Sequence, residues 1–162
     1  MSCLTPARRS RAVSWKPWAE LPRRPHIELV FDRLPPSTGG AMFVRDGGRA
    51  WIVLDPRLGR AERLCFITHE LIHDELGSSC RADGMPETWN DVVSRSEVAI
   101  DREVAARLVP GHRLAAFLRG SGCEFEVVCV HQVAEHFDVT EHIAEIALSR
   151  YAATHDWTQV VA

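Results

Sequence analysis

The segment RLCFITHELIHDELG, residues 63–77, carries two histidines four positions apart, with a glutamate directly after the first. This spacing constrains the fold, because side chains at positions i and i+4 lie one turn apart on the same face of a helix. Gly77 is a residue type that favours the end of a helix. We therefore predict a helix over about residues 60–76 that presents His69 and His73 on one face.

The same pair of histidines indicates a metal site. Neutral imidazole nitrogens suit zinc, which binds them in tetrahedral geometry. Glu70 lies about 100° around the helix from His69, so its carboxylate can reach a water molecule on the metal without being a ligand. This is the HExxH pattern of metalloproteases, in which the glutamate is the general base. For this helix taken alone, an ordinary surface pair of histidines remains the alternative interpretation.

A catalytic zinc ion also needs a third protein ligand and an open position. A second helix predicted at 91–108 offers Glu97 and, one turn later, Asp101, both on its apolar face. Buried carboxylates are costly unless they are paired or bind metal. Glu97 is therefore the expected ligand, with Asp101 accepting a hydrogen bond from a ligand histidine. Glu103 is the rival ligand, but it lies on the opposite side and can pair with Arg107.

The remainder of the chain predicts a single α+β domain. A small antiparallel or mixed sheet should precede the two metal-bearing helices, and a helical portion should follow them. The Asp46-Gly47 dipeptide between two apolar runs predicts a hairpin. The expected strands are 27–33, 41–45 and 49–54. The other expected elements are a loop at 77–90, a short helix at 112–118, an extended segment at 123–130 and two helices within 131–153 broken near Asp138.

Charge and cysteine usage limit the classes of protein. Residues 1–25 hold six basic groups and one acidic group, whereas the remainder holds 13 basic and 21 acidic residues. This predicts a basic flexible leader at 1–25 followed by a folded domain at 26–155. The five cysteines form no CxxC pair, which argues against a disulfide framework. With no transmembrane or secretory segment in the sequence, we expect a cytoplasmic protein.

The segment 131–153 has the spacing of a helix-turn-helix pair. A helix that reads DNA normally brings cations to the phosphates. The second helix of this pair instead brings Glu141 and Glu145, with Arg150 as the basic residue that offsets them. The segment is therefore interpreted as a packing or protein-recognition element, and nucleic acid is not an expected partner.

The order of the motifs resembles the ImmA/IrrE-type zinc metallopeptidases of phages, integrating elements and bacteria. The resemblance covers about residues 40–150 and rests on WIVLDPRLGRAERLCFIT before HELIH, then ExxxD and AARLVP. It implies a zincin-like fold and a gluzincin-like site, with His69, His73 and Glu97 on zinc and Glu70 as the base. The chain departs from the family at 100–104, where IDREV replaces an alanine- and asparagine-rich phrase.

The resemblance also implies a substrate and a place for it. Many relatives cleave a repressor encoded beside them, which releases a stress, excision or lytic programme. In that family the strand before the HExxH helix borders the cleft. The residues that could pair with an extended substrate are then Trp51, Ile52, Val53 and Leu54.

We therefore expect a zinc-dependent endopeptidase that cleaves a protein, namely a helix-turn-helix transcriptional repressor, in a bacterial cell or phage-infected host. The alternative is a non-catalytic, zinc-stabilised module that sequesters a regulator, and a DNA-binding regulator is a third possibility. Manganese or iron could occupy the same His₂Glu ligands. His112 and Tyr151 are candidate hydrogen-bond donors to the transition state.

Overall fold

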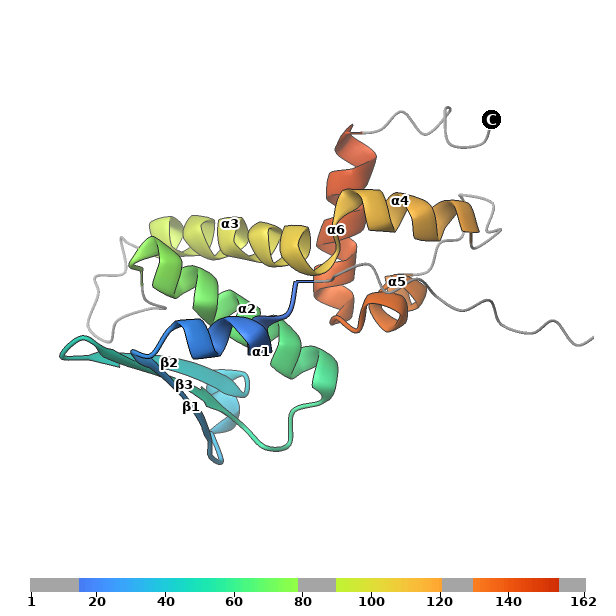
Figure 1. Cartoon of the computed structure of the whole chain (residues 1–162). Coiled ribbons are helices and arrows are strands. Elements are labelled where there is room, and N and C mark those ends of the chain that lie inside the picture. Colours follow the sequence, from blue (N-terminus) through green and yellow to red (C-terminus); the bar gives the residue numbers. More distant parts are fainter. Residues whose placement is uncertain (1–14, 79–89, 121–129, 155–162) are drawn as a thin grey trace, which may run out of the picture.

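The computed structural model describes residues 15–78, 90–120 and 130–154. Within these ranges it contains a three-stranded mixed sheet and six helices (Figure 1), so the prediction of an α+β chain is confirmed. The helices are α1 (Pro17–Glu20), α2 (Arg60–Leu76), α3 (Asn90–Leu108), α4 (Gly111–Gly120), α5 (Val130–Phe137) and α6 (Glu141–Thr154). In these ranges no helix is both long and apolar enough to cross a membrane.

The sheet is formed by β1 (Ile27–Phe31), β2 (Ala41–Asp46) and β3 (Arg49–Leu54). Its order is β1-β3-β2, with β1 parallel and β2 antiparallel to β3. The predicted hairpin is present, since Gly47 and Gly48 turn the chain with φ of 52° and 84°, values that favour glycine. β1 ends two residues earlier than predicted. Asp32 N–H still bonds Leu54 O at the end of β3, but Arg33 N–H bonds the Asp32 side chain and Leu34 N–H bonds Asp55.

Helix α2 has two apolar faces and lies between the sheet and α3 (Figure 1). On the sheet side, Ile67 and Leu71 are fully buried against the inward side chains of β3. On the other side, Cys65 and Ile72 join the core formed by α3 to α6. The helix is thereby fixed between two hydrophobic clusters, which leaves little freedom for the polar side chains that it carries.

The C-terminal helices enclose the second cluster. Helix α6 packs against α3 and α5. The predicted break near Asp138 is present between α5 and α6, and Asp138 has a φ of 60°. The predicted short helix at 112–118 lies within α4. The predicted extended segment at 123–130 is wrong at Val130, which begins α5, and its other residues lie outside the described ranges. Most of the predicted loop at 77–90 also lies outside them.

The predicted flexible leader needs correction for residues 15–25. These residues form α1 and a short 3₁₀ helix, Leu21–Arg23, and Pro17 is buried. Trp15 packs against the hydrophobic clusters, and the Arg107 guanidinium lies 5.4 Å from its ring centroid, a cation–π distance. Residues 1–14 of the predicted leader lie outside the described ranges. The folded body therefore begins before residue 26.

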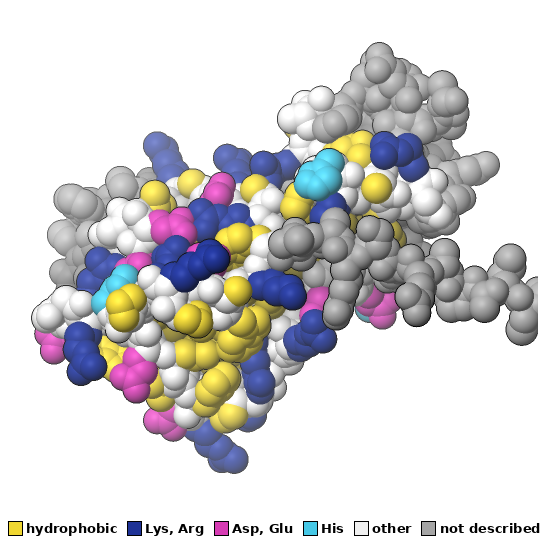
Figure 2. Space-filling model, in the orientation of Figure 1, with side chains coloured by type: hydrophobic (Ala, Val, Ile, Leu, Met, Phe, Trp, Pro, Cys, Tyr) yellow, Lys and Arg dark blue, Asp and Glu magenta, His cyan; other side chains and the backbone are white. Residues whose placement is uncertain are grey.

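On the face of the molecule drawn in Figure 2, hydrophobic side chains gather over α1 and the sheet, with basic side chains around them. The exposed large hydrophobic residues of these elements are Trp18, Phe31, Met42 and Val44. Met42 and Val44 belong to β2 and alternate with the buried Phe43, which faces α2. The two sides of β2 therefore lie in different environments, since one packs on the core and the other faces solvent.

The C-terminal end of α2 is tied to its neighbours by charge. Arg107 of α3 donates two hydrogen bonds to Glu75, at 2.9 and 2.6 Å, and Arg24 also bonds this carboxylate. The hydrogen bonds from Arg107, followed by those from Arg24, lower the pKa of Glu75 to about 2 despite its partial burial. Because the pKa is lower in the folded chain, Glu75 stabilises the fold above its unfolded pKa of about 4.5 and less as the pH falls.

We predict that Glu75→Gln lowers the free energy of unfolding by about 1 kcal/mol at pH 7. This is the magnitude expected for a charged network that is partly exposed to solvent. The difference from wild type should shrink as the pH falls from about 4.5 toward about 2, since the wild-type carboxylate is then protonated as well. Urea unfolding at pH 7 and pH 3 measures this. As a control, Glu135→Gln at an exposed position of α5 should change stability by less than about 0.5 kcal/mol at both pH values. An undiminished difference at pH 3 would contradict the assignment.

Candidate metal centre

Two imidazoles from α2 form the first half of the site. Their Nε2 atoms lie 3.0 Å apart, because His69 and His73 project from successive turns of the same helix face. Both ends of α2 are well defined. At its start the Glu62 carboxylate accepts a hydrogen bond from Gly59 N–H at 2.7 Å, and at its end Gly77 adopts a left-handed conformation. The helix predicted from the HELIH spacing is therefore confirmed, with the predicted bounds.

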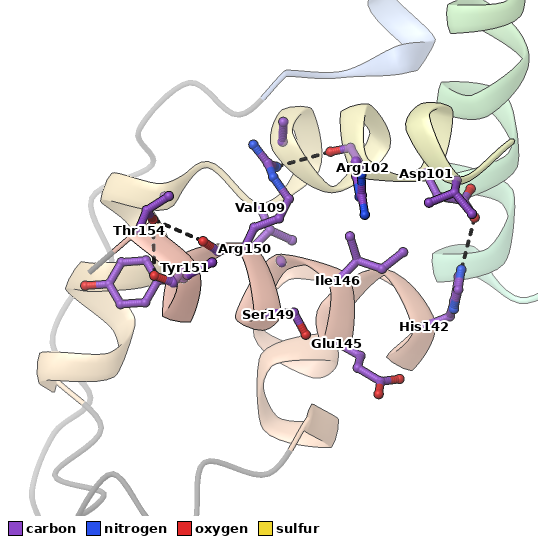
Figure 3. Close-up of a pocket in the computed structure, with 15 residues that line it drawn as sticks. Asp101, Arg102, Val109, His142, Glu145, Ile146, Ser149, Arg150, Tyr151 and Thr154 are labelled. Atoms are coloured by element: carbon purple, nitrogen blue, oxygen red, sulfur yellow. Dashed lines mark hydrogen bonds and ion pairs between the residues drawn. The ribbon is translucent and has the colours of Figure 1, made fainter. Parts of the chain in front are cut away.

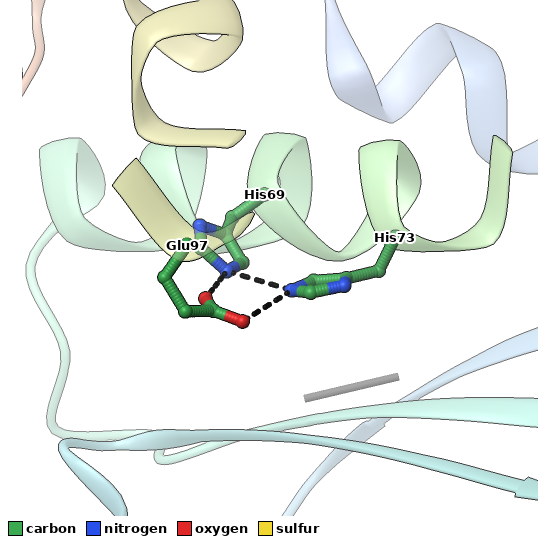
Figure 4. Close-up of side chains that lie close together, drawn as sticks. All are labelled: His69, His73 and Glu97. Atoms are coloured by element: carbon green, nitrogen blue, oxygen red, sulfur yellow. Dashed lines mark hydrogen bonds and ion pairs between the residues drawn. The ribbon is translucent and has the colours of Figure 1, made fainter. Parts of the chain in front are cut away.

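Helix α3 brings a carboxylate to the same point (Figure 4). Glu97 Oε2 lies 3.0 Å from His69 Nε2, and Glu97 Oε1 lies 3.5 Å from His73 Nε2. Zinc–nitrogen bonds of about 2.0–2.1 Å in a tetrahedron require donor atoms about 3.3 Å apart. The three separations in this cluster bracket that value. The residues present therefore fit a metal ion with three protein ligands, and His69, His73 and Glu97 together could hold one.

The other nitrogen of each imidazole is also engaged. His69 Nδ1 lies 3.1 Å from Asp101 Oδ1, and His73 Nδ1 lies 3.0 Å from Ser78 Oγ. An ionised carboxylate accepts only, so the contact with Asp101 requires a proton on His69 Nδ1. With a metal bound, this tautomer would present Nε2 as the ligand atom. Asp101 thus occupies the position predicted for it. Such outer contacts orient the rings, which is the arrangement that metal-ligating histidines require.

Ser78 reaches His73 because of the way α2 ends. Gly77 has a φ of 63°, and the backbone closes with Gly77 N–H to Asp74 O at 3.2 Å and Ser78 N–H to His73 O at 3.0 Å. Residue 78 is therefore folded back over the last turn, in the manner of a glycine-terminated helix. The end of the helix and the orientation of one candidate ligand are set by the same turn.

The electrostatics of the cluster also suit a cation. Hydrogen bonds with His69, followed by His73, lower the pKa of Glu97 to about 2 against the opposing effect of burial. For Asp101, burial raises the pKa, but the hydrogen bonds with His69 and His142 outweigh it and the net shift is downward. Both carboxylates are consequently ionised at neutral pH, the state that metal binding requires. His73 is only 1% exposed, whereas the side chains of His69 and Glu97 remain partly accessible.

Glu70 is buried on α2, with 4% of its surface exposed. It follows His69 directly and so lies about 100° around the helix from it. Together with Thr68 and His73 it makes α2 the main source of buried polar side chains in the described part of the chain. A glutamate in this position is beside the candidate ligands without being one of the three converging donors.

The rival ligand, Glu103, lies elsewhere. Its side chain is 48% exposed and accepts a hydrogen bond from Arg107 Nε at 2.9 Å, one turn further along α3. It does not belong to the converging cluster of the described residues. The geometry thus places Glu97 in the cluster. Glu103 instead forms the ion pair with Arg107 that its spacing predicts.

The prediction that Trp51 to Leu54 can receive a substrate strand is wrong. β3 is the central strand, and its residues 50–54 pair with β1 on one side and with β2 on the other. Ile52 and Leu54 are moreover fully buried beneath α2, and Trp51 Nε1–H bonds Glu28. The backbone groups of β3 are already used, so an added strand must pair with an edge strand, β1 or β2.

The two guesses for a transition-state donor lie in the C-terminal part. His112 is exposed in the first turn of α4, and Tyr151 is buried within the cluster of α6. Neither is one of the three converging donors. In contrast, sequence reasoning did not identify Ser78 or His142, whose Nε2 lies 3.1 Å from Asp101 Oδ2. No local pattern marks either residue, because each reaches the site through a turn or a tertiary contact.

Comparisons of the chain with protein-family models, with curated proteins and with solved structures found no match. What the site can bind therefore follows from the geometry and chemistry of its own residues. These are two imidazoles and one carboxylate from α2 and α3, with Asp101 and Ser78 holding the imidazoles in place.

We predict that the wild-type chain binds one metal ion and that Glu97→Ala raises its dissociation constant by at least about 100-fold, since one of three protein ligands is lost. Glu103→Ala removes a carboxylate from the same helix and should leave the affinity within about twofold. Metal content after dialysis and titration with a chromophoric chelator measure both. Full metal occupancy in Glu97→Ala, with loss in Glu103→Ala, would reverse the ligand assignment.

Proposed function

We propose that this chain is a zinc-dependent endopeptidase of the ImmA/IrrE type with a zincin-like fold, acting on a protein in the cytoplasm. The observation that carries the proposal is the convergence of His69, His73 and Glu97, which joins the HExxH helix to a carboxylate on the next helix. Zinc is the proposed metal because two imidazoles and one carboxylate form a ligand set typical of catalytic zinc. Manganese or iron in this set remains a testable alternative.

The number of protein ligands supports catalysis over a purely structural role. Structural zinc sites are closed by four protein ligands, whereas catalytic sites keep a position for water or substrate. Among the residues that the structure describes, the cluster contains three donors, and its His69 and Glu97 side chains are partly accessible. This combination favours a hydrolase over a zinc-stabilised module that only sequesters its partner.

The roles proposed for the residues follow from their positions. A bound zinc ion would supply Lewis acidity, which polarises a scissile carbonyl and lowers the pKa of a water molecule. Glu70, beside the ligand His69, accepts a proton from the attacking water on its carboxylate and delivers it to the leaving amine. Asp101 and Ser78 hold the two imidazoles in the orientation that presents their Nε2 atoms.

The substrate is proposed to bind as an extended segment along an edge strand. Among the described residues β2 pairs with β3 on one side only, and it carries the exposed apolar side chains Met42 and Val44. Backbone pairing to an edge gives affinity, and alternate side chains give specificity. β2 is therefore the preferred edge. That the substrate is a helix-turn-helix transcriptional repressor rests on the sequence resemblance alone.

We predict that Glu70→Gln retains one zinc ion per chain but cleaves the proposed repressor substrate, sought among helix-turn-helix proteins encoded by neighbouring genes, about 10²- to 10⁴-fold more slowly, since the general base is lost. The matched control is Glu103→Gln, which makes the same chemical change at an exposed position and should cleave at the wild-type rate. Metal content and gel analysis of repressor cleavage give the two readouts.

Two other outcomes of this experiment are informative. If wild type and Glu70→Gln both hold zinc and both bind the repressor without cutting it, the sequestering module is favoured. If Glu70→Gln cuts as fast as wild type, Glu70 is not the base and the proposed mechanism fails.

A further inference from the structure

The Asp101 carboxylate is shared between two histidines from different helices. Its Oδ1 lies 3.1 Å from Nδ1 of His69 on α2, and its Oδ2 lies 3.1 Å from Nε2 of His142 on α6. Figure 3 shows the His142 side chain directed at Asp101 across the groove between α3 and α6. The carboxylate of Asp101 on α3 thus connects this helix to both α2 and α6.

We propose that His142 is a positioning residue for the metal centre, acting through Asp101. The terminal torsion of an aspartate is broad, so one hydrogen bond alone leaves the carboxylate able to rotate. A second hydrogen bond on the other oxygen fixes the carboxylate plane and holds Oδ1 against His69 Nδ1. The inference rests on the proposed metal site but not on peptide cleavage.

The packing of α6 makes His142 a suitable anchor. It lies in the first turn of the helix, and the next two residues, Ile143 and Ala144, are buried in the C-terminal cluster. The start of α6 is also fixed by Ala144 N–H bonding to Thr140 O at 3.0 Å. The backbone that carries His142 is therefore held by the core, although its side chain is 65% exposed.

The chain offers both a conservative variant and a matched control. In His142→Gln the amide nitrogen sits where the ring Nε2 sits and can donate to Asp101, whereas His142→Ala cannot. His131 is a comparable surface histidine, 61% exposed, which pairs with Glu141 instead of Asp101. His131→Ala therefore reports what the loss of an exposed histidine does without touching the metal centre.

The first test uses the metal-free protein. Nitrogen-15 NMR of the imidazoles should show a protonated Nδ1 on His69 whose proton exchanges slowly with water, because it is held by Asp101. In His142→Ala this proton signal should be lost to exchange, in His142→Gln it should return, and in His131→Ala it should be unchanged. An unchanged His69 signal in His142→Ala would overturn the proposal, whether or not the chain binds zinc.

The second test measures zinc affinity in a double-mutant cycle. His142→Ala should raise the zinc dissociation constant about three- to tenfold, less than the roughly 10- to 100-fold typical of a direct partner of a metal ligand, because His142 acts through Asp101. His142→Gln should stay within about twofold of wild type, and His142→Ala should have no further effect once Asp101→Ala is present. Equal effects in both backgrounds would show that His142 does not act through Asp101. Failure of the wild type to bind zinc would refute the proposed function, and the NMR result would still decide this inference.

Discussion

The approach of one carboxylate to two imidazoles at the contact between α2 and α3 is the interaction on which the rest of this structure depends. Separations of 3.0 to 3.5 Å between Glu97 and the two Nε2 atoms require the helices to meet at a fixed height and rotation. Shifting either ligand by one position along its helix would rotate its side chain by about 100° around the helix axis and remove it from the site. The hydrophobic clusters on both sides of α2 supply that fixed geometry.

The position of α2 explains how so many polar groups are tolerated inside a small protein. One face packs on the sheet through Ile67 and Leu71, and another packs on the C-terminal helices through Ile72. The two histidines of the helix lie between these faces. His69 contacts Asp101 of α3 and His73 contacts Ser78 at the helix end, while the buried Thr68 hydroxyl donates to Leu64 O of α2 itself. Such partners are the condition for burying polar groups at acceptable cost. Rigid elements of this kind are what a catalytic site needs, since they hold side chains to within fractions of an ångström.

The parts of the fold that sequence could predict are those governed by local rules. Helix α2 follows from the spacing of its histidines and from Gly77, and the hairpin follows from Asp46-Gly47. The preference for Glu97 over Glu103 also came from helical periodicity. In each case the deciding residues lie within a few positions of one another, so 3.6-residue periodicity or a turn preference is sufficient.

The parts that sequence could not predict depend on contacts between distant segments. The central position of β3 depends on which strands pair with it. The sequence from Trp51 to Leu54 does not itself show whether this strand lies at the edge or at the centre of the sheet. The composition of residues 15–25 predicts a basic tail. In the structure Trp15 instead packs beneath the Arg107 guanidinium of α3, a contact that local sequence does not indicate. His142 and Asp101 are 41 residues apart, and no periodicity links them.

The turn at the end of α2 makes a residue without a side chain part of the candidate metal centre. A Cβ at Gly77 would meet no atom within 4 Å, so a survey of contacts would class the position as permissive. Yet the left-handed backbone there is what brings Ser78 over His73. In a library of random variants sorted for metal retention, substitutions at this glycine should segregate with those at the histidine and not with those of the surrounding surface.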